Sequence, residues 1–119
     1  IEGFIGKDET EKSLRIEIRD TYEGISETEL DRVVLDLPEP WTVVPHAQEV
    51  LVPGGIFLAY LPTVGQVMQL RAALDESRFG MAETLEVLQR GWNVDGLSVR
   101  PNHRMVAHTG FLTGARLLE

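Results

Sequence analysis

Two hydrophobic runs dominate the pattern of this chain, and each is followed by a segment of helical length. Residues 33–37 and 56–61 are bounded by proline and glycine, which is typical of strands buried on both faces of a parallel sheet. Residues 42–52 have helical length and end at a Pro-Gly-Gly turn. Thr63 and Gln66 form a capping-box pattern, which predicts a helix with one apolar face up to about residues 79–80.

Weaker patterns predict further elements at both ends of the chain. Strand-like alternation predicts strands over 14–20 and 83–94, and a second capping-box pattern, Ser26 with Glu29, predicts a short helix. A polar loop over 99–109 and a closing strand over 110–118 follow. Strands that alternate with helices indicate an α/β fold, in which ligands bind outside the carboxyl ends of the strands.

Composition limits the class of protein. A chain of 119 residues with 43% hydrophobic and 25% charged residues suits at most one globular domain. It has no cysteine, which excludes disulfides and thiolate metal sites and fits a reducing cytoplasm. No apolar run approaches the roughly 20 residues of a membrane-spanning helix, so we expect no membrane contact. The start at Ile1, without an initiator Met, predicts that residues 1–119 are a single-domain fragment of a longer protein.

Charge is distributed unevenly along the chain. The net charge of −8 argues against a general nucleic-acid binder. Residues 1–40 hold twelve acidic and five basic residues, whereas residues 90–119 hold four basic and two acidic ones. Only this C-terminal end suits a phosphate backbone, although the charge pattern alone favours solvated surface charges. The cluster consists of Arg90, Arg100, Arg104 and Arg116, with His103 and His108 beside them.

Carboxylates follow two of the predicted strands. Asp36 ends the buried run at residues 33–37, and Asp20 ends the strand at 14–20. A carboxylate at the end of a buried strand lies where it can be oriented by its neighbours and still reach a ligand. Alternatively, Asp36 caps the helix that begins near Trp41 and Asp20 is a turn residue. The pattern leaves both interpretations of Asp36 open and favours the turn for Asp20.

Several motifs, taken in order, resemble one enzyme family. They are LDLPEPW, the PGG turn followed by a strand, the P-T-V-x-Q of residues 62–66, QRGWNV, VRPNHRM and HTGFL. In order and spacing they are similar to the C-terminal half of bacterial tRNA (adenine-58-N1)-methyltransferases, closest to actinobacterial members. The resemblance implies a partial Rossmann-like class I sheet with its last strand antiparallel and its first two strands missing. It also implies transfer of a methyl group from S-adenosyl-L-methionine to N1 of adenine 58 in tRNA, in the cytoplasm.

The resemblance assigns roles to individual residues. Asp36 matches the active-site aspartate, and Asp20 matches the acid beside the donor adenine. The substrate side carries Tyr60, near Pro62 and Thr63, and the loop residues Arg100, Arg104, His108 and Thr109 for the tRNA. No metal is implied. Trp41 is expected to pack, and Trp92 is expected to be a core or interface aromatic.

One departure from the family concerns the methyl donor. The family's glycine-rich donor loop and its ribose-binding acid have no counterpart here, because Gly3 and Gly6 do not form that loop. We therefore expect weak donor binding or none by this chain alone. Two other functions stay open: a non-catalytic subunit that binds tRNA or a sister subunit, and a class I methyltransferase for another substrate.

The missing strands also predict an assembly. Without them, the run at 33–37 would present a hydrophobic, unpaired edge. Either residues 14–19 pair with it, which would place about the first 25 residues differently from their position in the full enzyme, or another chain does. The family assembles as tetramers, so the resemblance implies a homo-oligomer.

Overall fold

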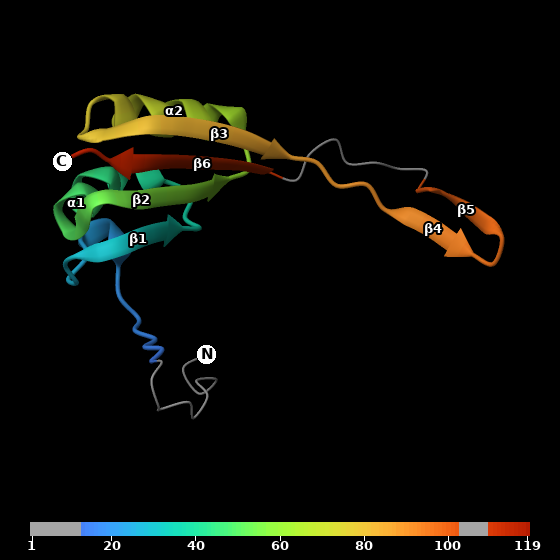
Figure 1. Cartoon of the computed structure of the whole chain (residues 1–119), viewed down its shortest axis with the longest axis horizontal. Helices are drawn as coiled ribbons and strands as arrows, with labels where there is room; N and C mark the ends of the chain where they lie inside the picture. The colour runs from blue at the N-terminus through green and yellow to red at the C-terminus, as the bar shows by residue number, and fades with distance from the viewer. Residues whose placement is uncertain (1–12, 103–109) are drawn as a thin grey trace.

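A four-stranded mixed sheet forms the centre of the molecule in the computed structural model, which describes residues 13–102 and 110–119. Its strands are β1 (Leu30–Leu35), β2 (Leu51–Leu61), β3 (Phe79–Val87) and β6 (Gly110–Leu117), in the order β1-β2-β6-β3 (Figure 1). β1 and β2 are parallel, whereas β6 runs antiparallel to both β2 and β3. The prediction of an α/β sheet with an antiparallel last strand is confirmed.

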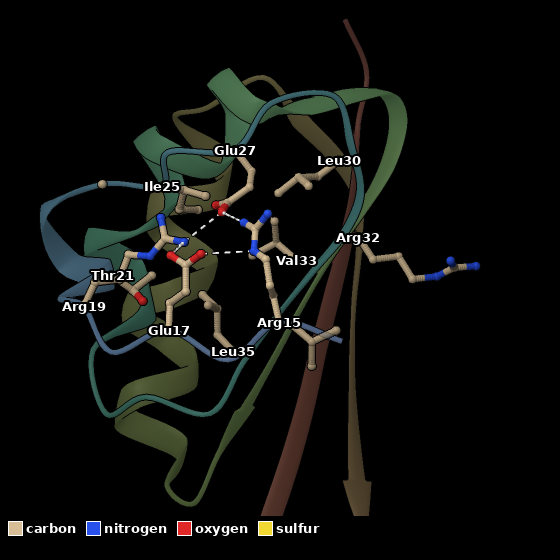
Figure 2. A pocket seen from close by; sticks show the side chains of 12 residues that line it. Arg15, Glu17, Arg19, Thr21, Ile25, Glu27, Leu30, Arg32, Val33 and Leu35 are labelled. Carbon is tan, nitrogen blue, oxygen red and sulfur yellow. Dashed lines mark hydrogen bonds and ion pairs between the residues drawn. The ribbon is translucent and has the colours of Figure 1, made fainter. Parts of the chain in front are cut away.

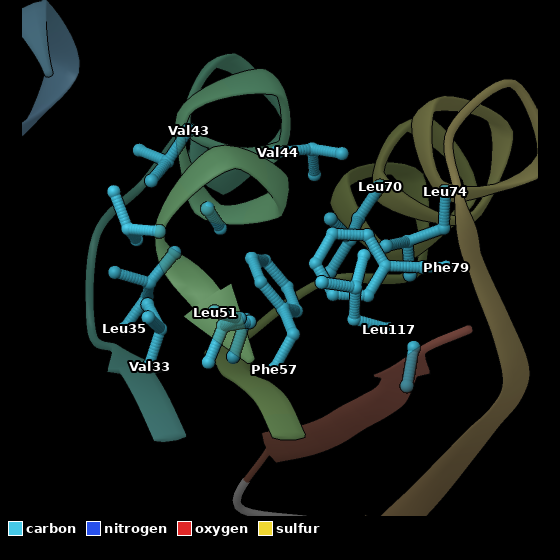
Figure 3. Close-up of a cluster of buried hydrophobic side chains, with 14 of the residues drawn as sticks. Val33, Leu35, Val43, Val44, Leu51, Phe57, Leu70, Leu74, Phe79 and Leu117 are labelled. Atoms are coloured by element: carbon cyan, nitrogen blue, oxygen red, sulfur yellow. The ribbon is translucent and has the colours of Figure 1, made fainter. Parts of the chain in front are cut away.

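Both α-helices pack on one face of this sheet (Figures 1 and 3). A short 3-10 turn, η3 (Pro40–Thr42), leads into α1 (Val44–Val50), and α2 (Val64–Asp75) follows β2. As predicted, Thr63 caps α2, because its hydroxyl oxygen accepts a hydrogen bond from the backbone N–H of Gln66 at 3.3 Å. Neither helix of the described residues is long and apolar enough to span a membrane.

The hydrophobic core lies between these helices and the sheet (Figure 3). Phe57 and Leu61 of β2 and Leu70 of α2 are fully buried. The ring of Phe57 packs against that of Phe79 with a centroid distance of 5.4 Å and an interplanar angle of 57°. Trp41 is partly buried against the core, in agreement with its predicted packing role.

The opposite face of the sheet exposes much of its apolar surface. Val34, Met81 and Leu85 lie on β1 and β3 and are 67%, 73% and 59% exposed. Successive strand residues point to opposite faces, so each buried residue has exposed neighbours in sequence. We call these the covered face and the uncovered face of the sheet.

The predicted strand over 14–20 was wrong. Residues 13–20 form no strand and join no sheet, so β1 is the outer strand on that side of the described sheet. Leu14 and Ile18 are 63% and 87% exposed, while Arg15 and Arg19 turn toward β1 and pair with carboxylates. The alternation was real, but Arg15 and Arg19 pair with Glu17 and Glu27 of the same N-terminal segment, and the described residues form no backbone ladder between this segment and β1. The edge of β1 was expected to pair either with residues 14–19 or with another chain. Pairing with residues 14–19 is not observed.

The predicted short helix at Ser26 and Glu29 was also wrong. The side chain of Arg19 donates a hydrogen bond to the hydroxyl of Ser26, so this hydroxyl caps no helix. Glu29 adopts a φ of 55°, in the left-handed region, which a right-handed helix does not tolerate. The helical turn in this region is instead η2 (Thr21–Glu23), five residues earlier than Ser26.

Two predicted boundaries near β3 need correction. α2 ends at Asp75 rather than near residues 79–80, because Ser77 folds its hydroxyl back onto the carbonyl of Leu74 and Phe79 starts β3. The predicted strand over 83–94 is two strands. Pairing of β3 with β6 ends where Val87 meets Gly110, and the chain then leaves the sheet.

Beyond that point the chain forms a separate hairpin. It consists of β4 (Trp92–Asp95) and β5 (Ser98–Pro101), which make a two-stranded sheet at one end of the molecule (Figure 1). Gly96, with a φ of 58°, supplies the left-handed residue of its two-residue turn. Trp92 is 53% exposed here, so it is not a core residue of this chain.

Candidate active site

Asp36 follows directly after β1, at the carboxyl end of the parallel pair β1 and β2. Leu35, the last residue of β1, pairs with Ala59 of β2, so one further step along both strands sets Asp36 beside Tyr60. Leu35 and Ala59 are buried on the covered face, whereas Asp36 and Tyr60 are exposed. By the alternation of strand residues, these two side chains belong to the uncovered face.

Two side chains from other elements hold the loop that follows Asp36. The amide Nε2 of Gln66 donates to the carbonyl of Pro38 at 2.9 Å, and the backbone N–H of Glu39 donates to the hydroxyl of Tyr22 at 3.2 Å. Gln66 also accepts a hydrogen bond from the Thr63 hydroxyl at 2.7 Å. These contacts limit the positions that the Asp36 backbone can take.

Gln66 and Tyr22 were not predicted as site residues. The sequence marked Gln66 only as part of a helix cap, although it lies in the P-T-V-x-Q motif that carried the family resemblance. Its contact with Pro38 joins residues that are 28 positions apart in the chain. No local pattern contains a contact of that span.

Asp20 caps the turn η2. Its Oδ1 accepts a hydrogen bond from the backbone N–H of Tyr22 at 3.0 Å, which is the geometry of the turn interpretation. The carbonyl of Tyr22 lies 3.2 Å from Nε2 of His46 on α1. Tyr22 therefore connects the Asp20 turn to both α1 and the loop after Asp36. A role for Asp20 beside a donor adenine stays a prediction.

The remaining predicted residues fall in three places. Tyr60 is the second-last residue of β2, two positions before Pro62 and three before Thr63, the N-cap of α2. Arg100 is an exposed residue of β5, on the hairpin at the far end of the molecule from α1 (Figure 1). The structure thus brings together Asp36 and Tyr60, and it places Arg100 on a different sheet. Arg104, His108 and Thr109 lie outside the described residues.

A cavity of about 370 Å³ lies between residues 15–27 and β1 (Figure 2). Arg15 and Arg19 both pair with Glu27, at 2.9 and 2.7 Å, and both also pair with Glu17. The hydrogen bond from Arg19 lowers the pKa of the Glu27 carboxyl and raises the pKa of the guanidinium. The charges of Arg15 and Arg19 are therefore compensated by Glu17 and Glu27, and none of the predicted site residues lines this cavity.

The fold implies S-adenosylmethionine as methyl donor, and the described residues suit only one part of it. The exposed carboxylate of Asp20 leaves Oδ2 without a bond to the turn and suits an exocyclic amine. In residues 13–102 and 110–119, however, no glycine-rich loop leads from a strand to a helix N-terminus. The described residues therefore do not form a complete donor site. They also contain no group of three or more His, Asp or Glu side chains placed to hold a metal ion.

The strand order and the antiparallel β6 define the fold of a class I methyltransferase, and solved structures agree. A SAM-dependent O-methyltransferase from Thermotoga maritima superposes with a TM-score of 0.79 at 35% identity, covering 88% of this chain and 40% of that one. A tRNA methyltransferase TrmI from Aquifex aeolicus superposes with a TM-score of 0.71 at 29% identity, covering 82% of this chain and 40% of that one.

The chain belongs to the family described as tRNA methyltransferase complex GCD14 subunit, whose model matches residues 5–99. It is 40% identical over 101 residues to the tRNA (adenine(57)-N(1)/adenine(58)-N(1))-methyltransferase TrmI of Methanocaldococcus jannaschii, and 38% identical over 92 residues to the tRNA (adenine(58)-N(1))-methyltransferase TrmI of Thermus thermophilus. These matches cover 84% and 77% of this chain but only 36% of each relative. The chain thus spans little more than a third of the length of these relatives.

Proposed function

We propose that the protein to which this chain belongs transfers a methyl group from S-adenosylmethionine to N1 of adenine 58 in tRNA. Membership of the tRNA methyltransferase family and the activity in the names of its relatives support this proposal. The observation that carries it is the position of Asp36. This carboxylate follows β1 at the carboxyl end of the sheet, beside Tyr60, on a loop that Gln66 and Tyr22 hold.

Asp36 has one main role in the proposed reaction. Adenine N1 is a weak nucleophile that lies in the plane of the ring. The Asp36 carboxylate accepts a hydrogen bond from the exocyclic N6 amine, which orients the base and raises the electron density at N1. As N1 gains the methyl group the ring becomes positive, and the nearby carboxylate stabilises that charge. The donor supplies the methyl group as a sulfonium, so neither a metal nor a covalent enzyme intermediate is required.

Tyr60 and the basic residues complete the proposal. The exposed ring of Tyr60 offers an apolar face to a base that has left its stack. Arg100, Arg104, His108 and Thr109 belong to the segment that we assign to tRNA, with the two arginines on phosphates. Asp20 serves the donor adenine. We also propose that the protein is a homo-oligomer, since β1 is the outer strand of the described sheet and an unpaired strand edge is a template for pairing with another chain.

Asp36→Asn in the complete protein tests the function. The substitution keeps the size of the side chain but removes its charge, so we expect kcat for tRNA methylation to fall by about 10²- to 10³-fold. Donor affinity should change little, because Asp36 acts on the acceptor base. The matched control is Asp31→Asn, which removes one carboxylate from the same strand at its other end. Turnover that stays at the wild-type level in Asp36→Asn removes Asp36 from the mechanism.

The non-catalytic subunit remains the second candidate, because the family is described by its place in a complex. Methyl transfer to tRNA, and its dependence on Asp36, distinguish the two functions. If the purified protein binds tRNA but adds no methyl group, and Asp36→Asn does not change the activity of the assembled complex, the chain is a binding subunit. A protein that methylates a small molecule and ignores tRNA would instead support a different class I methyltransferase.

A further inference from the structure

Gly110 lies directly under the ring of Tyr60. A Cβ atom added at Gly110 would come within 2.1 Å of Cε1 of Tyr60 and within 2.5 Å of both Cζ and the hydroxyl oxygen. These three atoms are the nearest neighbours of such a Cβ, and real Cβ atoms essentially never approach another heavy atom within 3.0 Å. Any side chain at residue 110 would therefore displace the ring.

The strand register explains this contact. Tyr60 pairs with Leu112 of β6, and Gly110 is two residues before Leu112 on the same face of the sheet. Diagonal neighbours of this kind lie within reach of an aromatic side chain. The ring of Tyr60 therefore leans over β6. It leans away from β1, where Asp36 lies on the other side of β2.

Backbone conformation does not explain the glycine. Gly110 lies in regular antiparallel pairing with Val87, and its φ is outside the left-handed region that favours glycine. Glycine inside a strand weakens the strand and often marks a close approach of another group. Among the described residues, the Tyr60 ring above its Cα is the structural reason for a glycine here.

We infer that Gly110 is a positioning residue, which holds the Tyr60 ring over β6 and thereby keeps the space beside Asp36 open for a flat purine base. With a side chain at residue 110 the ring must move. The ring can then no longer lie over Gly110 on β6, and a movement across β2 brings it toward Asp36. This inference rests on the proposed function, since it concerns the acceptor base of that reaction.

A purely structural role makes a different prediction. An aromatic ring that covers a strand glycine also protects the strand, so Gly110 and Tyr60 could act in stability alone. In that case Gly110→Ala would lower the unfolding temperature and leave the kinetics of the folded protein unchanged. A positioning role requires a loss in kcat/KM for tRNA at temperatures where the variant is fully folded.

Gly110→Ala and Gly114→Ala form a matched pair for this test. Gly114 is on the same strand and the same face, but a Cβ there meets only ordinary contacts of 3.5 Å with Leu58 and Phe57. We expect kcat/KM of the complete protein to fall by about 10²-fold in Gly110→Ala, the usual effect of a misplaced contact group. We expect a change of no more than about twofold in Gly114→Ala. Equal effects of the two substitutions would overturn the inference.

A double variant assigns the effect to the ring. Tyr60→Leu removes the ring, so adding Gly110→Ala to it should cause no further loss of kcat/KM. Fluorotyrosine NMR of the complete protein reports on the ring without requiring any activity. Only the Tyr60 resonance, assigned by Tyr60→Phe, should shift in Gly110→Ala.

The outcomes separate the two proposals. A Tyr60 resonance that does not move in Gly110→Ala shows that Gly110 does not place the ring. A shifted resonance with unchanged kcat/KM shows a structural role only. If the wild-type protein does not methylate tRNA, the proposed function fails, and the NMR shift still decides whether Gly110 places Tyr60.

Discussion

The two faces of the four-stranded sheet differ in what their side chains do. On β2, Ala59 is completely buried under the helices while its neighbour Tyr60 is 38% exposed on the other face. The same alternation on β6 buries Thr113 and leaves Leu112 half-buried. Because successive strand residues point to opposite faces, a single strand contributes to the core on one face and carries the proposed site residues on the other.

This comparison shows where substitutions should affect the protein. The covered face carries the tightly packed core, so its residues determine the free energy of unfolding. The uncovered face carries Asp36, Tyr60 and Gly110, whose substitutions should act first on function. Substitutions on the two faces therefore need different measurements, and the three that follow are ordered by their expected effect on stability.

Phe57→Ala gives the largest expected effect. Phe57 is fully buried and packs on Phe79, so truncation leaves a cavity and should lower the free energy of unfolding by about 3 to 5 kcal/mol. Urea denaturation measures the loss. Leu85→Ala on the uncovered face is the control, with an expected change within about 0.5 kcal/mol. Similar losses in both variants would show that the two faces are equally packed in solution.

Gln66→Glu gives an intermediate effect at the boundary between stability and site. Glutamate keeps the size of the side chain but cannot donate to the carbonyl of Pro38, so the loss should be about 0.5 to 1.5 kcal/mol. The negative charge itself is favourable near a helix N-terminus. Gln69→Glu, at an exposed position of the same helix, controls for charge. We expect kcat to fall only in Gln66→Glu; a fall in both variants would mean that charge, not loop position, matters.

Glu27→Gln gives the smallest effect. The pKa of Glu27 is lowered in the folded protein, chiefly by the hydrogen bond from Arg19, so its stabilisation is present above the ordinary glutamate pKa and is lost as the pH falls through the folded value. Exposed ion pairs contribute little and are screened by salt. Thermal unfolding of the wild-type protein and of Glu27→Gln, at neutral and at acidic pH, measures this pH-dependent contribution to stability.

The control for Glu27→Gln is Glu23→Gln, which removes one charge outside the ion-pair cluster of Figure 2. The wild-type advantage over Glu27→Gln should be small at neutral pH and should vanish in acid and in high salt. An advantage that persists in acid would show that another contact of the side chain, rather than its ionised carboxylate, stabilises the fold.

Elements whose signal is local were predictable from the sequence. The buried runs of β1 and β2, the Thr63 cap of α2 and the closing strand β6 were each recognised from adjacent residues and are confirmed. The position of Asp36 at the end of a buried strand belongs to the same group. Its signal was the interruption of an apolar run by one carboxylate.

Elements whose outcome depends on a partner were not predictable. Residues 14–20 have the alternation of a strand, but Arg15 and Arg19 pair with Glu17 and Glu27 of the same segment, and no ladder with β1 forms in the described structure. Residues 83–94 read as one strand because the sequence does not show where pairing with β6 ends. Strand propensity describes a residue's fit to a sheet, and the available partners decide whether the strand forms.

For the candidate site, the sequence determined which chemical groups are present and placed Asp36 and Tyr60 at the ends of their strands, whereas Arg100 was expected in a loop and lies on β5. Only the tertiary structure set Asp36 beside Tyr60, fastened the loop at Pro38 to Gln66 and laid the Tyr60 ring on Gly110. These contacts join residues 24, 28 and 50 positions apart. Side-chain chemistry is a property of each residue alone, whereas contacts of such span exist only once strand register and helix packing are set.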